Sequence, residues 1–413
     1  MKDAIEANGR SYAPPAAPTV GICIDGNEPA YLEAAAEVMP NLQAIRRRGA
    51  EGLVRTVVPS FTNPNNVAIV TGAPPAVNGI PGNYYYDGDA EVMMNDPRYL
   101  RAPTLLAAFG RAGYRVAAVT AKDKLRRLLG HGLDGICFSV ERAQEATRDE
   151  HGIDGVLDLV GRPNPGIYDP EASVWCIEAG ARLLERERPD LMYLSTTDFV
   201  QHKWAPGEPE ANAFYAGLDR FIGQLDQAGA VLGIVADHGM NAKTRPDGTP
   251  NVRYLESALV EAGVPEARVI LPITDPYVVH HGALGSYATV HTAPDNVERA
   301  AAVLAGIPGV EAVHPRDEAA RAYDLPSDRI GDLVVLADRG TVLGRTPEWH
   351  DLTEVQSGLR SHGGLHEATV PMLFNRPLKE EHARRLGAGE ARNYDLFDFL
   401  CNGVNDTDGA NGA

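Results

Sequence analysis

The sequence predicts an α/β fold in which helices flank a mostly parallel central sheet, with a smaller α+β cap inserted late in the chain. Three observations predict it. Short apolar runs alternate with helix-length segments as far as about residue 241, which is typical of a parallel sheet covered on both faces. Between about 254 and 349 the segments are shorter and less regular. The first pattern then resumes at 370–374 and continues to 401.

The expected core strands are short apolar runs at 20–25, 53–58, 114–120, 191–196, 230–236 and 370–374. The expected core helices are 28–48, 65–71, 104–111, 171–188, 208–227 and 395–401. The first helix ends before Gly49, and the second begins after Pro64, a residue tolerated in a first helical turn. In the cap we expect helices at 255–262 and 295–305 and strands at 268–271, 286–291 and 332–336.

This pattern also predicts the domain organisation. We expect an N-terminal tail at 1–17, a catalytic core at 18–245 and 355–403, and a cap at 246–354. Residues 404–413 are polar and Gly-rich, so we expect a disordered tail. A length of 413 residues agrees with two to three domains, at roughly 150 residues each.

The charge balance excludes some classes of partner. Lys and Arg number 38 and Asp and Glu number 56, so the formal charge is 38 − 56 = −18. Nucleic acid and anionic membrane surfaces both need a basic protein face, so we expect neither as a partner. A small anionic substrate stays compatible, because bound metal cations are absent from this sum and can dominate a local field.

The cysteines and the apolar runs indicate a reduced cytoplasmic protein. Cys23, Cys137, Cys176 and Cys401 lie far apart and form no Cys-x-x-Cys pair, which argues against a disulfide framework and a Cys-type zinc site. Residues 1–18 contain no apolar signal-peptide core, and no apolar run approaches the roughly 18 residues of a membrane span. The oligomeric state stays open, a homodimer included.

Residues with metal-binding side chains stand at or near the ends of the expected strands. Parallel sheets bind ligands outside the carboxyl ends of their strands, so we expect these residues to converge. An Asp after a strand is by itself more often a turn former, and a single His is more often a structural residue. The set is more specific than its parts: Asp25, Thr62, Asp198, His202, Asp237, His238 and His362.

Three carboxylates, three imidazoles and one hydroxyl provide mixed nitrogen and oxygen ligands for two metal ions. This mixture suits zinc, and manganese or iron less well. Two metals about 3.5–4 Å apart can stabilise the attacking and leaving groups of an in-line phosphoryl transfer.

Thr62 is the candidate nucleophile. A threonine hydroxyl reacts poorly at neutral pH unless a metal or a base removes its proton. Thr62 stands just before an expected helix, where free backbone N–H groups favour a phosphate. The alternative is that Thr62 is only a helix N-cap, and without the other ligands that alternative would be preferred.

The ordered motifs resemble the alkaline phosphatase superfamily. They are Asp25, FTNPNN at 61–66, Asp198-x-x-x-His202, DHGM at 237–240 and HGG at 362–364. Within the superfamily the chain resembles the phosphodiesterase-like branch and its phosphonoacetate hydrolases, because of PSFTNPNN at 59–66, GNYYYD at 82–87 and AKDK at 121–124. The resemblance covers about residues 18–403 and implies an alkaline-phosphatase-like core.

The resemblance also implies roles for individual residues. One zinc would be held by Asp198, His202 and His362, and the other by Asp25, Asp237, His238 and the oxygen of Thr62. Thr62 would attack phosphorus and form a phosphothreonine. Asn83, Lys122 and Lys124 would contact the substrate. The segment SHGGLHE contains two histidines; His362 matches the His-Gly pattern, and His366 is the alternative.

The implied reaction is the hydrolysis of phosphonoacetate to acetate and phosphate, a step of phosphonate catabolism with a small anionic substrate. A carbanion leaves poorly, but an adjacent carboxylate can take up its charge, and cations there would stabilise that charge. Lys122 and Lys124 suit this role as compact charges, although a solvated lysine pair is an equal alternative. Two rival functions stay open: a nucleotide pyrophosphatase/phosphodiesterase on the same core, and a metal-binding protein without catalysis.

Overall fold

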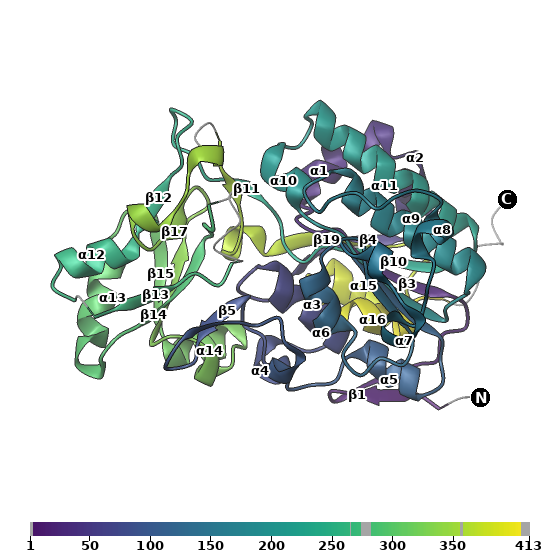
Figure 1. Ribbon diagram of the computed structural model, residues 1–413, viewed down its shortest axis with the longest axis horizontal. Helices are drawn as coiled ribbons and strands as arrows, with labels where there is room; N and C mark the ends of the chain where they lie inside the picture. Colours follow the sequence, from purple (N-terminus) through teal and green to yellow (C-terminus); the bar gives the residue numbers. More distant parts are fainter. Residues whose placement is uncertain (1–2, 265, 274–281, 356–357, 406–413) are drawn as a thin grey trace.

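The computed structural model describes residues 3–264, 266–273, 282–355 and 358–405. It contains a larger lobe around a central sheet and a smaller lobe around a second sheet (Figure 1). No helix in these ranges is long and apolar enough to cross a membrane. The α/β fold class expected from the sequence is confirmed.

Within the described residues the central sheet has seven strands in the order β4-β19-β10-β3-β9-β7-β8. The neighbours from β10 to β8 pair in parallel, and β19 pairs antiparallel with both of its neighbours. The sheet is therefore mostly parallel, as expected. The strand bounds are Ala50–Arg55 (β4), Thr369–Phe374 (β19), Val231–Val235 (β10), Thr19–Cys23 (β3), Leu191–Ser195 (β9), Val116–Thr120 (β7) and Ile136–Ser139 (β8).

Helices cover both faces of this sheet (Figure 1). One face packs on α2 (Pro40–Arg48), α9 (Glu171–Arg186) and α11 (Pro209–Gln227), whose apolar side chains share one core with strand residues such as Val20 and Leu194. The opposite face packs on α3 (Thr62–Thr71), α5 (Leu105–Arg111) and α16 (Leu396–Asp398). Burial on both faces explains why the central strands are continuous apolar runs.

The single helix expected at 28–48 is wrong. The chain forms α1 (Pro29–Ala34), a 3₁₀ turn at Ala36–Val38 and then α2, which starts at Pro40. Proline cannot donate the backbone hydrogen bond that a continuous helix needs, but it is well suited to a first turn. The expected N-terminal tail also contains a hairpin of β1 (Ile5–Ala7) and β2 (Arg10–Tyr12), whose Ile5 and Tyr12 are buried against the core.

The smaller lobe holds a sheet that, in the described residues, has the order β13-β14-β16-β15 with antiparallel neighbours. These strands are Arg268–Ile270, Tyr287–His291, Leu333–Ala337 and Val310–Pro315. Helices α12 (Leu255–Glu261) and α13 (Val297–Ala305) share an apolar core with this sheet. The elements fall within the residues of the expected cap, and we propose that the lobe is that cap. Residues 406–413 of the expected disordered tail lie outside the described residues.

Candidate active site

The parallel strands bring the expected metal ligands to one edge of the central sheet. Asp25 comes two residues after the end of β3, and Asp237, followed by His238, comes two residues after the end of β10. Asp198 follows β9 and precedes the short helix α10 (Phe199–Lys203), which carries His202. The carboxyl ends of parallel strands meet at the same edge, so residues more than 200 positions apart in the sequence become neighbours.

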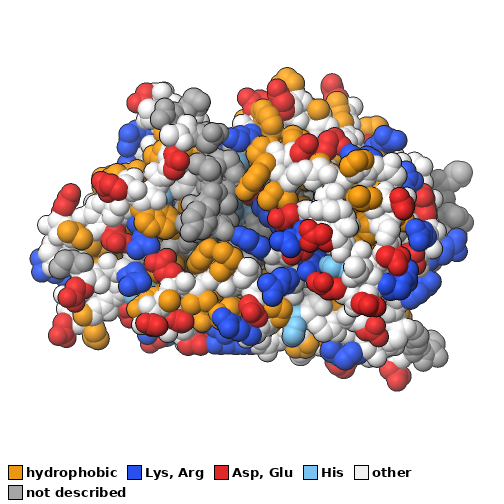
Figure 2. Space-filling view, in the orientation of Figure 1, with side chains coloured by type: hydrophobic (Ala, Val, Ile, Leu, Met, Phe, Trp, Pro, Cys, Tyr) orange, Lys and Arg blue, Asp and Glu red, His pale blue; other side chains and the backbone are white. Residues whose placement is uncertain are grey.

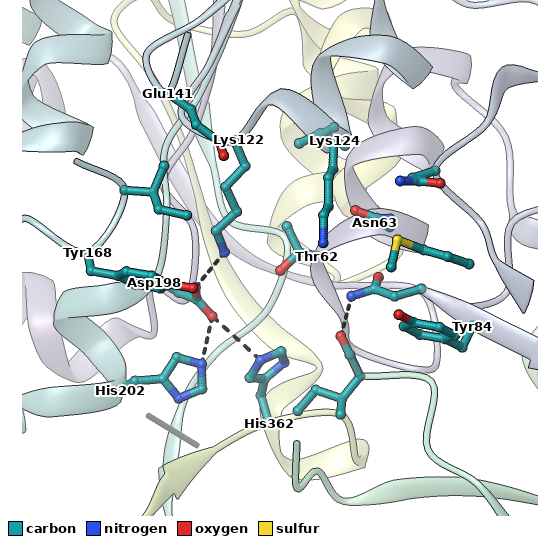
Figure 3. A pocket seen from close by; sticks show the side chains of 16 residues that line it. Thr62, Asn63, Tyr84, Lys122, Lys124, Glu141, Tyr168, Asp198, His202 and His362 are labelled. Atoms are coloured by element: carbon teal, nitrogen blue, oxygen red, sulfur yellow. Dashed lines mark hydrogen bonds and ion pairs between the residues drawn. The ribbon is translucent and has the colours of Figure 1, made fainter. Parts of the chain in front are cut away.

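The first cluster consists of Asp198, His202 and His362. The Oδ2 atom of Asp198 lies 2.9 Å from Nε2 of His202 and 3.6 Å from Nε2 of His362. All three side chains are buried, and their ligand atoms are close enough to bind one metal ion. Figure 3 shows the carboxylate of Asp198 between the two imidazoles and the Lys122 ammonium.

The second cluster lies around His238. Its Nε2 is 3.1 Å from Oδ1 of Asp25, 3.3 Å from the hydroxyl of Thr62 and 3.9 Å from Oδ2 of Asp237. It is also 4.0 Å from Oδ2 of Asp198, which therefore lies between the two clusters. One ligand atom of each of Asp25, Asp198 and His238 lies within 4.8 Å of the other two. Asp237 is not part of this closest group.

The two histidines of SHGGLHE lie in different surroundings. The imidazole of His362 is stacked on that of His238 with centroids 3.6 Å apart, whereas His366 is 39% exposed and pairs with Glu311 at 2.7 Å. Gly363 adopts a φ of 116°, and a Cβ there would lie 2.3 Å from a ring carbon of Phe61. Only glycine fits this position, so the His-Gly pair directs His362 into the cluster.

Each clustered histidine is oriented through its second ring nitrogen. The Nδ1 atom faces a backbone carbonyl at 2.8–2.9 Å: that of Arg360 for His202, Gly239 for His238 and Ser60 for His362. This contact places an N–H on Nδ1 and turns Nε2 toward the cluster, which is the usual orientation of metal-binding histidines.

The electrostatics of the clusters fit divalent cations. Burial, then Asp198 and Asp237, raises the pKa of Asp25 to about 8. Burial opposes a charged His238, but Asp237 and Asp25 outweigh it and raise the pKa of that ring to about 10. In the described part of the chain neither oxygen of Asp25 receives a well-formed hydrogen bond, although His238 is near. Buried carboxylates without donors are suited to metal ions, so the residues present fit the expected metals.

Thr62 and the two expected lysines line one cavity of about 120 Å³ beside the clusters. Thr62 is the first residue of α3, and Lys122 and Lys124 follow β7, at the same sheet edge. Lys122 reaches Asp198 at 3.2 Å, and although burial opposes its charge, Asp198 and Asp25 raise the pKa of Lys122 above its ordinary value. In Figure 3 both ammonium groups point toward the centre of the cavity.

Asn83 also lines the cavity, but one of its amide hydrogens is already used. Its Nδ2 donates to the carbonyl of Ile273, and its backbone N–H donates to the carbonyl of Pro272 at 2.9 Å. The residue thus joins the hairpin of β5 (Tyr84–Tyr86) and β6 (Glu91–Met93) to the smaller lobe. Among the described residues, no group accepts the second amide hydrogen of Asn83.

Several cavity residues were not expected from the sequence, among them Asn63, Glu141 and Tyr168. Asn63 is adjacent to Thr62. Glu141 follows the end of β8, so recognition of that strand in the sequence would have indicated Glu141 as a candidate site residue. Tyr168 lies in the loop before α9 and contacts Phe199 with ring centroids 6.0 Å apart. Nothing in the sequence around Tyr168 indicates this contact.

The family comparison agrees with this geometry. A model described as type I phosphodiesterase / nucleotide pyrophosphatase matches residues 19–365. Mouse ectonucleotide pyrophosphatase/phosphodiesterase family member 1 is 24% identical over 239 residues, and venom phosphodiesterase of Macrovipera lebetinus is 25% identical over 254 residues. These alignments cover 54% and 58% of this chain. The chain spans about a quarter of the length of these curated relatives (24% and 28%).

Two crystal structures of phosphonoacetate hydrolase from Sinorhizobium meliloti 1021, one with phosphonoformate and one with phosphonoacetate, are much more similar. Each is 50% identical with a TM-score of 0.93, covering 97% of this chain and 99% of that chain. Murine ectonucleotide pyrophosphatase/phosphodiesterase 5 in complex with AMP is 18% identical with a TM-score of 0.62, covering 93% and 94% of the two chains. At that identity the likeness concerns the fold alone.

Proposed function

Because the chain belongs to the type I phosphodiesterase/nucleotide pyrophosphatase family and is 50% identical to a phosphonoacetate hydrolase, we propose that it hydrolyses the C–P bond of phosphonoacetate. The products are acetate and phosphate. The observation that carries the proposal is one cavity lined by Thr62, by the three candidate ligands of the first cluster and by Lys122 and Lys124. A small substrate with a phosphonate and a carboxylate carries negative charge that bound metal ions and the two lysines would neutralise.

The metal ligands divide into two sets. Asp198, His202 and His362 would hold one ion, and Asp25, Asp237 and His238, with the oxygen of Thr62, would hold the other. The mixture of imidazole and carboxylate ligands favours zinc. When bound, the two cations supply positive charge that polarises the phosphonate and favours loss of the proton from a nearby hydroxyl.

Thr62 is the nucleophile of the proposed reaction. Its place at the start of α3 puts the hydroxyl at the cavity wall, where the N-terminus of the helix would favour a bound anion. The oxygen attacks phosphorus, its proton passes to solvent, and an O–P bond forms as the C–P bond breaks. Water then hydrolyses the phosphothreonine, which releases phosphate and restores the hydroxyl.

The electron pair of the broken C–P bond moves onto the leaving acetate. The charge spreads into the adjacent carboxylate as an enediolate, and the carbon then takes a proton from solvent. Lys122 and Lys124 carry positive charge at the cavity wall and stabilise the developing anion. Asn83 orients the substrate through its remaining amide hydrogen.

A second candidate function is the hydrolysis of nucleotide diesters. Two aromatic side chains, Tyr84 and Tyr168, line the cavity, and an aromatic slot is what a nucleobase would need. The two functions differ in the use of the lysines, since a diester has no carboxylate next to phosphorus. A metal-binding role without catalysis does not explain a threonine hydroxyl at 3.3 Å from His238.

Turnover of phosphonoacetate and of a nucleoside monophosphate aryl diester by the purified zinc-loaded protein separates the candidates. We expect kcat/KM for phosphonoacetate to be at least about a hundredfold higher, which corresponds to roughly 2.7 kcal/mol of transition-state stabilisation. A preference for the diester would favour the second candidate. Lack of turnover of either substrate, with zinc bound, would favour a non-catalytic role.

A further inference from the structure

A buried ion pair lies behind the metal-ligand clusters and has no part in the reaction described above. Lys243 and Glu367 are both almost inaccessible to solvent, and Nζ of Lys243 lies 2.8 Å from Oε1 of Glu367. Removing two charges from water is costly and is often not repaid in stability. Stabilisation of the fold is therefore by itself a weak explanation for this ion pair.

Glu367 connects two segments of the chain through its hydrogen bonds. Its Oε2 accepts the backbone N–H of Gly364, two residues after His362, at 3.1 Å. Its Oε1 accepts the side-chain amide of Asn241, three residues after His238, at 2.6 Å. The backbone carbonyl of Glu367 accepts the N–H of Gly239 at 2.8 Å. One residue thus joins the segment that carries His362 to the segment that carries Asp237 and His238.

Lys243 extends the network to the smaller lobe. Besides Glu367, its ammonium donates to the carbonyl of Arg339 at 2.9 Å, and Nε of Arg339 donates to Oδ1 of Asn241 at 2.9 Å. Arg339 follows β16 of the second sheet. The same segments also pair through β11 (Asn241–Ala242) and β18 (Arg360–Ser361), so the network supports a junction that already exists in the backbone.

From this arrangement we propose that Glu367 and Lys243 are positioning residues that hold the two ligand-bearing segments in register for metal binding. The inference rests on the proposed metal sites and adds the residues that fix their geometry. Glu367 does not contact the metal ligands through its side chain, and it acts through the backbone of Gly364 and the amide of Asn241. Outer contacts of this kind commonly change metal affinity by about ten- to a hundredfold.

Zinc affinity of Glu367→Gln, measured by competition with a chromophoric chelator, tests the proposal. The matched control is Asp219→Asn. Asp219 is equally buried and accepts backbone N–H groups of Asn41 and Leu42, but it joins α11 to α2, neither of which carries a proposed ligand. We expect zinc affinity to fall at least about tenfold in Glu367→Gln and to stay unchanged in Asp219→Asn. The visible absorption of the cobalt-loaded protein should change in the first variant only.

The double variant Lys243→Met/Glu367→Gln removes the lysine charge that the single variant leaves buried without its partner, so the comparison holds even where the single variant does not fold. The same loss of zinc affinity is expected. Unchanged affinity and an unchanged cobalt spectrum in either folded variant would overturn the positioning role. A wild-type protein that binds no zinc would instead overturn the proposed function.

Discussion

Asp198 occupies the central place among the site residues, because it contacts both proposed ligand sets and Lys122. Burial opposes its charge, yet Lys122 and His202 hold the pKa of Asp198 well below its usual range. Lys122 therefore contacts the carboxylate of a proposed metal ligand, in addition to its proposed contact with the substrate. The contact of Lys122 with Asp198 could not be expected from the sequence, in which the two lysines look equivalent.

The contact between Lys122 and Asp198 leads to a prediction for the two lysines. Lys124→Ala should lower turnover of phosphonoacetate about tenfold or more, because a charge-assisted hydrogen bond contributes roughly 1.5–3 kcal/mol. It should change turnover of an aryl phosphate ester much less. Lys122→Ala should lower both, since the contact with Asp198 is lost as well. Steady-state kinetics of both variants on both substrates provide the check, and equal losses for Lys124→Ala would contradict a carboxylate-binding role.

Helix α3 is the element that positions the proposed nucleophile, and a buried asparagine fixes the start of the helix. Oδ1 of Asn65 accepts the backbone N–H of Val57 at 2.9 Å, and its Nδ2 donates to the carbonyls of Pro59 and Phe61 at 3.2 and 3.0 Å. These bonds hold the loop between β4 and Thr62. The FTNPNN motif thus contains both the proposed nucleophile and the residue that orients its loop.

Asn65→Ala should lower the free energy of unfolding by about 2–4 kcal/mol, since buried backbone groups lose their partners. It should also reduce kcat, because the hydroxyl of Thr62 is no longer held in place. Asn375→Ala is the control: Asn375 bonds the backbone of Leu232 and Ala230 at the amino end of β10, away from the site. Urea denaturation and kinetics of the folded protein measure the two effects. Normal kcat in Asn65→Ala would contradict the role.

The predictability of the elements follows from their burial. Strands such as β3, β9 and β10 are buried on both faces, so they appear as apolar runs and their ends could be located from the sequence. The strand β8 was missed because Ile136–Ser139 is only four residues long and lies at the edge of the sheet. Glu141 was missed with it. Contacts between distant loops, such as those of Asn83 and Glu367, leave no periodic pattern.

At the scale of the whole molecule, the charge of −18 contrasts with the local charge at the site. Figure 2 shows Lys and Arg side chains gathered near the centre of the visible face, where the two lobes meet. The three buried carboxylates Asp25, Asp198 and Asp237 still concentrate negative charge at the sheet edge. The proposed metal ions are thus needed to reverse the field before a multiply charged anion can bind.

Removal of metal should therefore affect both activity and stability. We expect about two zinc ions per chain by elemental analysis, as a two-metal site requires. Chelation should abolish turnover, and added zinc should restore it. Zinc at a hundredfold excess over its dissociation constant should stabilise the fold by about 2.7 kcal/mol, seen as a higher melting temperature. A metal-free protein with full activity would contradict this expectation.

The central claim is that Thr62 takes the phosphoryl group directly from carbon. The most direct test mixes the zinc-loaded protein with phosphonoacetate, quenches the reaction in acid within one turnover and analyses the peptides by mass spectrometry. The account predicts phosphate on Thr62 and release of one acetate per phosphorylated chain. Thr62→Ala should show neither, and Thr62→Ser should form phosphoserine. Full turnover by Thr62→Ala, or acetate release with Thr62 never phosphorylated, would contradict the account.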